Sequence, residues 1–223
     1  MSLDLVWHYA PSLLSGFAVT ILCWAAGSTL GLALGFAIAL LRRLQIPPLN
    51  GLIRAFIELF RGTPFLVQLF LLYAGGPSIG LRLSATAAGV LGLGLYSSAY
   101  FAEIFRAGFA AVPVGQIEAA ASVGMRQFDT MIRVMLPGAL IAAVPAIVNM
   151  LIILTKETVV LSIITVPELM YQVQTMAAET FTAFDAIFAM AIFYWFLVEA
   201  VSRLGARIEN RVTAFLAHEE ARA

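Results

Sequence analysis

The side chains that most often carry chemistry in proteins are scarce in this chain. Its two histidines, His8 and His218, lie near opposite ends, and its one cysteine, Cys23, lies within an apolar run. They offer no nucleophile–base pair and no cluster of metal ligands. A Walker A loop needs glycine directly before its lysine, whereas the only lysine, Lys156, follows Thr155. We therefore expect neither catalysis nor a bound metal or cofactor in this chain.

One adjacent pair of opposite charges, Lys156-Glu157, lies between two apolar runs. Ionisable groups are costly at membrane depth and usually face a cavity or a partner there. One interpretation is that the pair lines a solute path with Asn149, one to two helical turns earlier. A zwitterion such as an amino acid would complement the two charges. The other interpretation is a neutral pair at the outer membrane interface, and the sequence leaves both open.

A polar stretch, Pro113 to Pro137, separates two apolar runs. Its first part, about 116–123, is rich in alanine and predicts a short helix. Gly124 then predicts a turn, because glycine tolerates backbone conformations that strain other residues. The second part, about 125–135, predicts an amphipathic helix. Its apolar face comprises Met125, Phe128, Ile132 and Met135, and its polar face comprises Arg126, Asp129, Thr130 and Arg133. Pro137 is expected to end this helix.

The composition is that of a membrane protein. Hydrophobic residues make up 61% of the 223 residues and charged residues 12%, whereas a soluble domain carries about 25% charged residues. The formal net charge is zero, so no basic field suggests a nucleic-acid partner. No basic segment precedes the first apolar stretch, and we expect that stretch to be a retained span rather than a cleaved signal peptide.

Five helices are expected to cross the bilayer, since a span requires about 20 apolar residues. Their predicted limits are about 14–41, 57–74, 84–105, 138–155 and 184–204. In the first, Gly27, Gly31 and Gly35 predict a close helix–helix face, and Pro145 predicts a kink in the fourth. Residues 156–179 are expected to form a short re-entrant or interfacial helix followed by a loop.

The basic residues predict the orientation. Eleven of the 13 lie in the turn 42–61, the loop 103–137 and the C-terminal region: Arg42, Arg43, Arg54, Arg61, Arg106, Arg126, Arg133, Arg203, Arg207, Arg211 and Arg222. Only Arg82 and Lys156 fall on the other side. By the positive-inside rule, the N-terminus is outside, and the polar loop and a short tail, 213–223, are cytoplasmic. Glu103 and Arg106, three residues apart, are expected to form a structural ion pair.

The polar stretch closely resembles the EAA loop of ABC-transporter permeases. Glu118-Ala119-Ala120, Gly124, Val134 and Leu136-Pro137 occur at the spacing of that signature, with Val134 where isoleucine is usual and Gly138 where glutamine is usual. In that family the loop forms coupling helices that sit in a groove of a cytoplasmic ATPase. The resemblance therefore implies a coupling role for Glu118, Ala119, Ala120, Gly124, Leu136 and Pro137.

Three further segments resemble polar amino-acid uptake permeases of the histidine, glutamate and arginine group. They are Arg61-Gly62-Thr63-Pro64-Phe65-Leu66-Val67-Gln68, the run Ala99 to Gly108, and Lys156-Glu157-Thr158, where that group has K-D-T. Together the likenesses cover about 15–212, the expected type-1 transmembrane domain. Glu157 and Val159 depart from the group's aspartate and serine, which leaves the substrate's identity open.

The resemblance implies one permease subunit of a binding-protein-dependent importer in a bacterial inner membrane. The expected partners are a second permease subunit, identical or homologous, two ATPase subunits that bind ATP and magnesium, an extracytoplasmic binding protein and an amino-acid substrate. The alternative is a secondary transporter or channel subunit driven by an ion gradient. That class favours inverted repeats or acidic residues at the midplane, whereas this chain shows no internal repeat and carries its acidic residues mainly at span ends.

Overall fold

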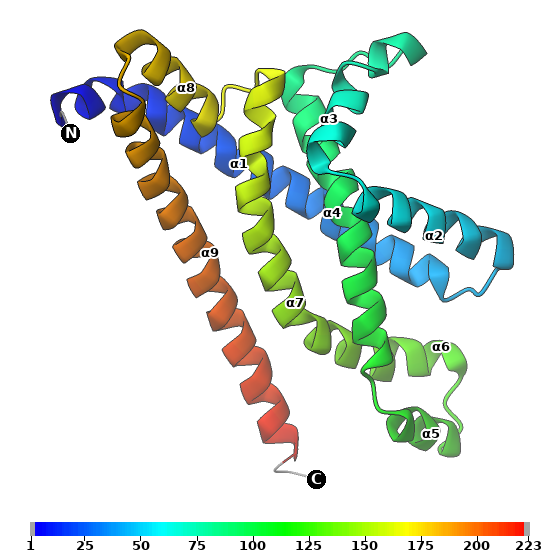
Figure 1. Cartoon of the computed structure of the whole chain (residues 1–223). Helices are drawn as coiled ribbons and strands as arrows, with labels where there is room; N and C mark the ends of the chain where they lie inside the picture. Colours follow the sequence, from blue (N-terminus) through cyan, green and yellow to red (C-terminus); the bar gives the residue numbers. More distant parts are fainter. Residues whose placement is uncertain (1–2, 221–223) are drawn as a thin grey trace.

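The computed structural model describes residues 3–220, and within that range it contains helices and no strands (Figure 1). The long helices are α1 (Leu3–Arg42), α4 (Ala85–Ala110), α7 (Leu136–Glu157) and α9 (Ala183–Glu220). The shorter ones are α2 (Pro47–Gly62), α3 (Phe65–Tyr73), α5 (Val114–Ser122), α6 (Gln127–Thr130) and α8 (Leu169–Thr180). The predicted all-α fold class is confirmed.

Helix α1 crosses α4 at close range along the predicted glycine face. Gly27, Gly31 and Gly35 are all buried. A Cβ atom added at these positions would collide with Leu93, Ser97 and Phe101 of α4, respectively. The missing side chains let the two backbones approach, as small residues do in membrane helix pairs. The predicted helix–helix face is confirmed.

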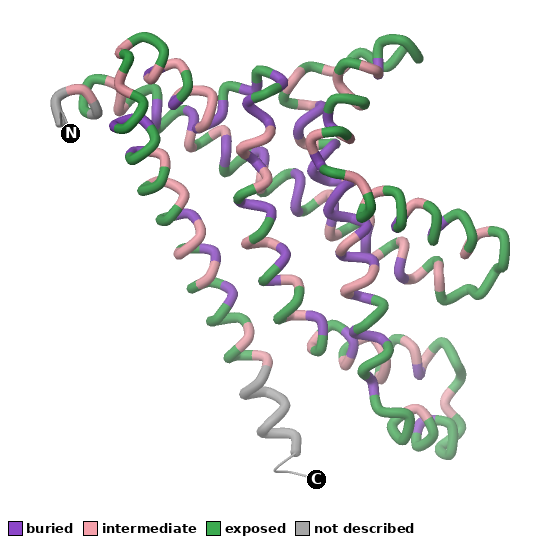
Figure 2. The backbone as a smooth tube through the Cα atoms, viewed as in Figure 1, coloured by how far each residue is buried: buried purple, intermediate pink, exposed green. Residues whose placement is uncertain are grey.

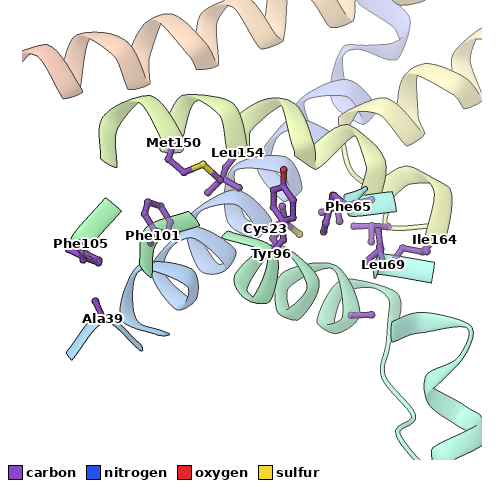
Figure 3. Packing of buried hydrophobic residues seen from close by; sticks show 14 of the residues in the cluster. Cys23, Ala39, Phe65, Leu69, Tyr96, Phe101, Phe105, Met150, Leu154 and Ile164 are labelled. Atoms are coloured by element: carbon purple, nitrogen blue, oxygen red, sulfur yellow. The ribbon is translucent and has the colours of Figure 1, made fainter. Parts of the chain in front are cut away.

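Helix α4 lies at the centre of the molecule, and Figure 2 shows it mostly buried while α2 and α5 are mostly exposed. Its buried Tyr96 and Phe101 belong to one apolar cluster with residues of α1, α3 and α7 (Figure 3). The Trp24 side chain on α1 donates a hydrogen bond to the Leu151 carbonyl on α7, at 3.0 Å. The core therefore fixes α1, α4 and α7 relative to one another.

The predicted second span, 57–74, is not one helix. The chain bends by 108° between α2 and α3. Thr63 is extended there, with φ −117° and ψ 144°, because a residue before proline avoids the helical region. The Gln68 amide donates to the carbonyls of Phe60 and Thr63, at 2.8 and 3.0 Å, and so satisfies groups released by the break.

Pro137 does not end the second helix of the polar loop, which corrects that prediction. Helix α6 continues through a π-helical segment, Met131–Met135, into α7, and the Leu136 N–H donates to the Met131 carbonyl. Pro137 is the second residue of α7 and directly follows the π-helical segment. The π turn changes the hydrogen-bond register immediately before the proline.

The segment after α7 is more helical than predicted. A 3₁₀ helix, Thr158–Ile164, ends at Thr165, whose φ is +64°. Helix α8 then occupies most of the stretch expected to be a loop. The predicted last span, 184–204, lies within α9, which also continues through 213–220 of the predicted tail, and residues 221–223 lie outside the described part of the chain.

Four described helices are long and apolar enough to cross a membrane, and the bent α2–α3 pair makes a fifth if it counts as one span. Figure 1 shows the N-terminus at one end of the molecule and α5, α6 and the C-terminal part of α9 at the other. This arrangement matches an odd number of crossings. It also places the polar loop 113–137 at the end opposite the N-terminus.

Candidate functional site: an exposed helical loop and a polar cleft

The polar loop turns at Gly124 through a defined hydrogen-bond motif. Gly124 has φ +75°, in the left-handed region. Its N–H donates to the Ala121 carbonyl at 3.0 Å, and the Met125 N–H donates to the Ala120 carbonyl at 3.1 Å. These are the two bonds of a Schellman cap, which requires a left-handed residue at the position of Gly124. The predicted glycine turn between the helices is confirmed.

The residues of the predicted coupling set face different surroundings. Glu118, Ala119, Gly124 and Pro137 are exposed, Leu136 is half-buried and Ala120 is buried. Large apolar side chains also face outward on this loop, with Val123 78% and Phe128 75% exposed.

The loop is anchored to two spanning helices. Buried Phe109 and Val112, at the end of α4, pack with Ala139 of α7. Ile117 of α5 and Met131, Met135 and Leu136 pack against that cluster. The loop is therefore packed against the ends of both α4 and α7.

On α7, the structure brings Asn149 and Lys156 to one exposed face. They are seven residues apart, so they lie within about 20° of each other around the helix axis, and both are exposed. Glu157 is half-buried, and no ion pair joins it to Lys156 among the described residues. Two of the three side chains, Asn149 and Lys156, are therefore exposed on the same face of α7.

A polar cleft between α4 and α7 was missed by sequence reasoning. It has a volume of about 560 Å³, and its lining includes Arg61, Tyr100, Glu103 and Arg106. The guanidinium of Arg61 lies over the Tyr100 ring, 5.3 Å from its centroid. The predicted Glu103–Arg106 ion pair is confirmed at 2.7 Å. Charged side chains from distant parts of the sequence thus line one cleft.

Two tyrosine hydroxyls lie at this cleft and beside it. Tyr100 lines the cleft, and its hydroxyl is 3.4 Å from that of Tyr96. Two tyrosines four residues apart among small residues were the available sequence signal, because that spacing places them on one helix face.

Glu168 is a second feature that the sequence did not reveal. It lies in the connection before α8 and is fully buried. Its Oε1 accepts from the Tyr171 N–H at 3.0 Å, and its Oε2 accepts from Thr20 and Tyr194 hydroxyls at 3.3 and 3.4 Å. One carboxyl thus caps α8 and ties it to α1 and α9. An acidic residue directly before a helix was the missed signal.

Glu168 makes stability depend on pH. Burial raises the pKa of Glu168 from its ordinary 4.5 to about 7, and the hydrogen bonds that it accepts offset part of that rise. The folded state then holds a proton that the unfolded state releases, so stability falls as pH rises from about 4.5 to about 7. The shift corresponds to a loss on the order of 3 kcal/mol. We expect Glu168→Gln to remove this part of the pH dependence of the melting temperature in detergent.

Glu179→Gln is the matched control for that measurement. Glu179 is an exposed carboxylate at the other end of α8, where it accepts a hydrogen bond from Tyr9 at 2.6 Å. This variant is expected to keep the wild-type pH profile. An unchanged profile in Glu168→Gln would contradict the buried, protonated state of Glu168.

The remaining chemistry-bearing residues form no site in the described structure. Cys23 is buried in the core, and no group of histidine, cysteine and acidic side chains that could hold a metal occurs in the described part of the chain. His8 is exposed near the N-terminal end of α1. The side chain of His218 lies outside the described residues.

These features define a class: a multi-pass helical membrane protein that presents an anchored, partly apolar helical loop at one end. Comparison with known proteins assigns the chain within that class. It belongs to the family described as binding-protein-dependent transport system inner membrane component, which matches residues 27–214. The chain is therefore a permease subunit of a binding-protein-dependent transport system in the inner membrane.

Individual relatives agree with this assignment over most of their length. The probable amino-acid permease protein YxeN of Bacillus subtilis (strain 168) is 38% identical over 190 residues, 84% of this chain and 85% of the relative. The probable amino-acid ABC transporter permease protein PatM of Vibrio harveyi is 38% identical over 87% and 88% of the two chains. The crystal structure of an amino acid ABC transporter with histidines matches with a TM-score of 0.88 and 36% identity, over 95% of this chain and 100% of that one.

Proposed function

We propose that this permease carries an amino acid inward across the membrane. The observation that supports this most strongly is the likeness, over nearly the whole chain, to a solved amino acid ABC transporter and to permeases named for amino acids. A second permease subunit completes the path, two ATPase subunits bind ATP and magnesium and supply the energy, and an extracytoplasmic binding protein delivers the substrate. The bilayer surrounds the spanning helices.

The loop 113–137 is the ATPase-coupling element of this proposal. Its exposed Val123 and Phe128 provide apolar contact area, and Glu118 adds a charge on the same loop. Ala119 and Ala120 have small side chains, so a partner surface can come close to the backbone of α5. Leu136 and Pro137 join the loop to α7. ATP-driven closure of the ATPase pair moves α5, and the packed cluster around Phe109 passes that motion to α4 and α7.

The substrate path of this proposal follows the polar groups between α4 and α7. Asn149, Lys156 and Glu157 lie toward the end opposite the loop, and Tyr96 and Tyr100 lead to the cleft that contains Arg61 and Glu103. A lysine and a carboxylate match the two charges of an amino acid. The excess of basic residues in 42–61, 103–137 and α9 supports a cytoplasmic loop and C-terminus with the N-terminus outside.

Co-purification tests the assembly directly. The tagged permease, expressed with a candidate ATPase, is expected to retain that ATPase through purification. Addition of substrate-loaded binding protein should then stimulate ATP hydrolysis in liposomes. Retention of no ATPase by the folded permease would contradict the coupling role of loop 113–137.

The path makes a separate prediction for Glu157. Glu157→Gln removes the charge that faces the substrate's ammonium group, and loss of one charge-assisted contact is expected to raise the KM for uptake by about tenfold or more. ATPase co-purification should be unchanged. Glu58→Gln, an exposed carboxylate on α2, is the control and is expected to transport normally. An unaltered KM in Glu157→Gln would remove Glu157 from the path.

A further inference from the structure

A basic pocket lies where α1 ends beside α4. It has a volume of about 280 Å³ and is lined by Arg42, Arg43, Gln45 and Arg106, together with apolar atoms of Ala39, Phe109 and Ala110. Three guanidinium groups and no carboxylate line it. Such a lining favours an anion, and arginine pairs best with planar or tetrahedral oxyanions such as phosphate.

The positive charge of this pocket is only partly balanced. Glu103 accepts from Arg42 at 2.5 Å and from Arg106 at 2.7 Å, so one carboxylate serves two arginines. Arg43 has no carboxylate partner among the described residues. Its guanidinium lies over the Phe109 ring, 4.8 Å from the centroid, and one nitrogen reaches the Met135 sulfur at 3.6 Å. Two positive charges therefore remain for a ligand.

The surroundings of the pocket suit an amphiphilic ligand, because exposed apolar side chains lie beside the basic lining. Leu41, Leu44 and Ile46 flank the arginines and are 43%, 59% and 45% exposed. The pocket is also at the ends of two spanning helices, the level at which arginine side chains reach lipid headgroups. A ligand with a phosphate beside apolar chains would satisfy both parts of this surface.

We propose that this pocket binds the phosphate of an anionic phospholipid in the leaflet on the side of loop 113–137. Arg42, Arg43 and Arg106 hold the phosphate, and the acyl chains lie along Leu41, Leu44 and Ile46. Basic pockets between spanning helices are known to hold anionic headgroups. Because the same helix ends carry the cluster that anchors α5, a bound lipid would also brace the base of the coupling loop.

Native mass spectrometry of the purified permease, titrated with dioleoyl-phosphatidylglycerol, tests this proposal. Arg43→Gln removes the arginine without a carboxylate partner and is expected to weaken lipid binding by about tenfold. Arg54→Gln removes an exposed arginine of α2 outside the pocket and is expected to leave binding unchanged. Gln45→Glu, at an exposed position of the pocket rim, introduces a carboxylate that repels the phosphate and competes with it for the arginines, and should also weaken binding.

Each other outcome overturns the proposal. Equal affinity of wild type, Arg43→Gln and Gln45→Glu would show that the pocket does not hold the lipid. Displacement of the lipid by millimolar inorganic phosphate would assign the pocket to a soluble anion. Unchanged lipid affinity together with weaker ATPase co-purification would assign these arginines to a protein contact.

Discussion

Replacement of Gly124 by valine is expected to reduce ATP-driven uptake strongly while the permease remains in the membrane. The left-handed backbone at Gly124, φ +75°, is a strained conformation for a β-branched residue. The cost, about 1–2 kcal/mol or more for a β-branched residue, offsets most of the net stabilisation of about 1–3 kcal/mol that two backbone hydrogen bonds provide. The Schellman cap opens, and α5 and α6 lose their mutual orientation. Uptake and ATPase retention should both fall by at least about tenfold.

Two matched variants distinguish the loss of the turn from the effect of added side-chain volume. Gly115 lies on the same loop with open space around it, as Gly124 does, but within helix α5. Gly115→Val is therefore expected to retain most activity. Gly124→Asn should recover much of the loss, because asparagine tolerates the left-handed region. Equal loss in Gly115→Val and Gly124→Val would show that volume on this surface matters rather than the turn.

Gly35→Ala is expected to destabilise the membrane core although it adds only one methyl group. A Cβ atom at Gly35 would lie 2.5 Å from the Phe101 Cβ, 2.9 Å from the Ala102 nitrogen and 2.9 Å from the Ser98 carbonyl oxygen. Backbone atoms cannot move aside as a flexible side chain can, so α1 and α4 must separate. Overpacking of this kind costs about 1–3 kcal/mol. The melting temperature in detergent should fall by about 5–10 °C, with less protein recovered from the membrane.

Gly51→Ala provides the control for that measurement. Gly51 lies within helix α2 and has nothing within 4 Å of an added Cβ atom. Alanine is the better helix former, so this change should be neutral or stabilise the protein by up to about 1 kcal/mol. A Gly35→Ala variant as stable as wild type would contradict the close α1–α4 contact.

The features predicted best from the sequence are those in which one residue type has a direct backbone consequence. The turn at Gly124 and the glycine face of α1 both follow from the missing side chain. The spanning helices follow from long runs without charge. In these cases a property of the local sequence, a missing side chain or a long apolar run, directly determines the structure that forms.

The bend between α2 and α3 was missed although its signal was present. Pro64 forces Thr63 into an extended conformation, yet the apolar run from residue 62 to 81 predicts an unbroken span when hydropathy alone is considered. Pro137 led to the opposite error, because a helix end was predicted there and the helix continues. Its helix continues through Pro137, because the π segment before the proline changes the hydrogen-bond register.

The site was predictable only in part, because its remaining members meet through tertiary packing. The loop residues Glu118 to Pro137 are close in sequence, so their pattern was visible. Arg61 meets Tyr100 only because the end of α2 packs against α4, and Glu168 meets Thr20 and Tyr194 only where α1 and α9 meet the start of α8. A single sequence carries no signal for such contacts.

The most direct test of the transport assignment is amino-acid uptake into proteoliposomes that contain the permease, its ATPase and the binding protein. The proposed function predicts uptake that requires enclosed ATP, the ATPase and the binding protein, and that persists when ion gradients are abolished. Uptake that needs no ATPase and follows an imposed proton or sodium gradient would contradict it and would support a secondary transporter instead.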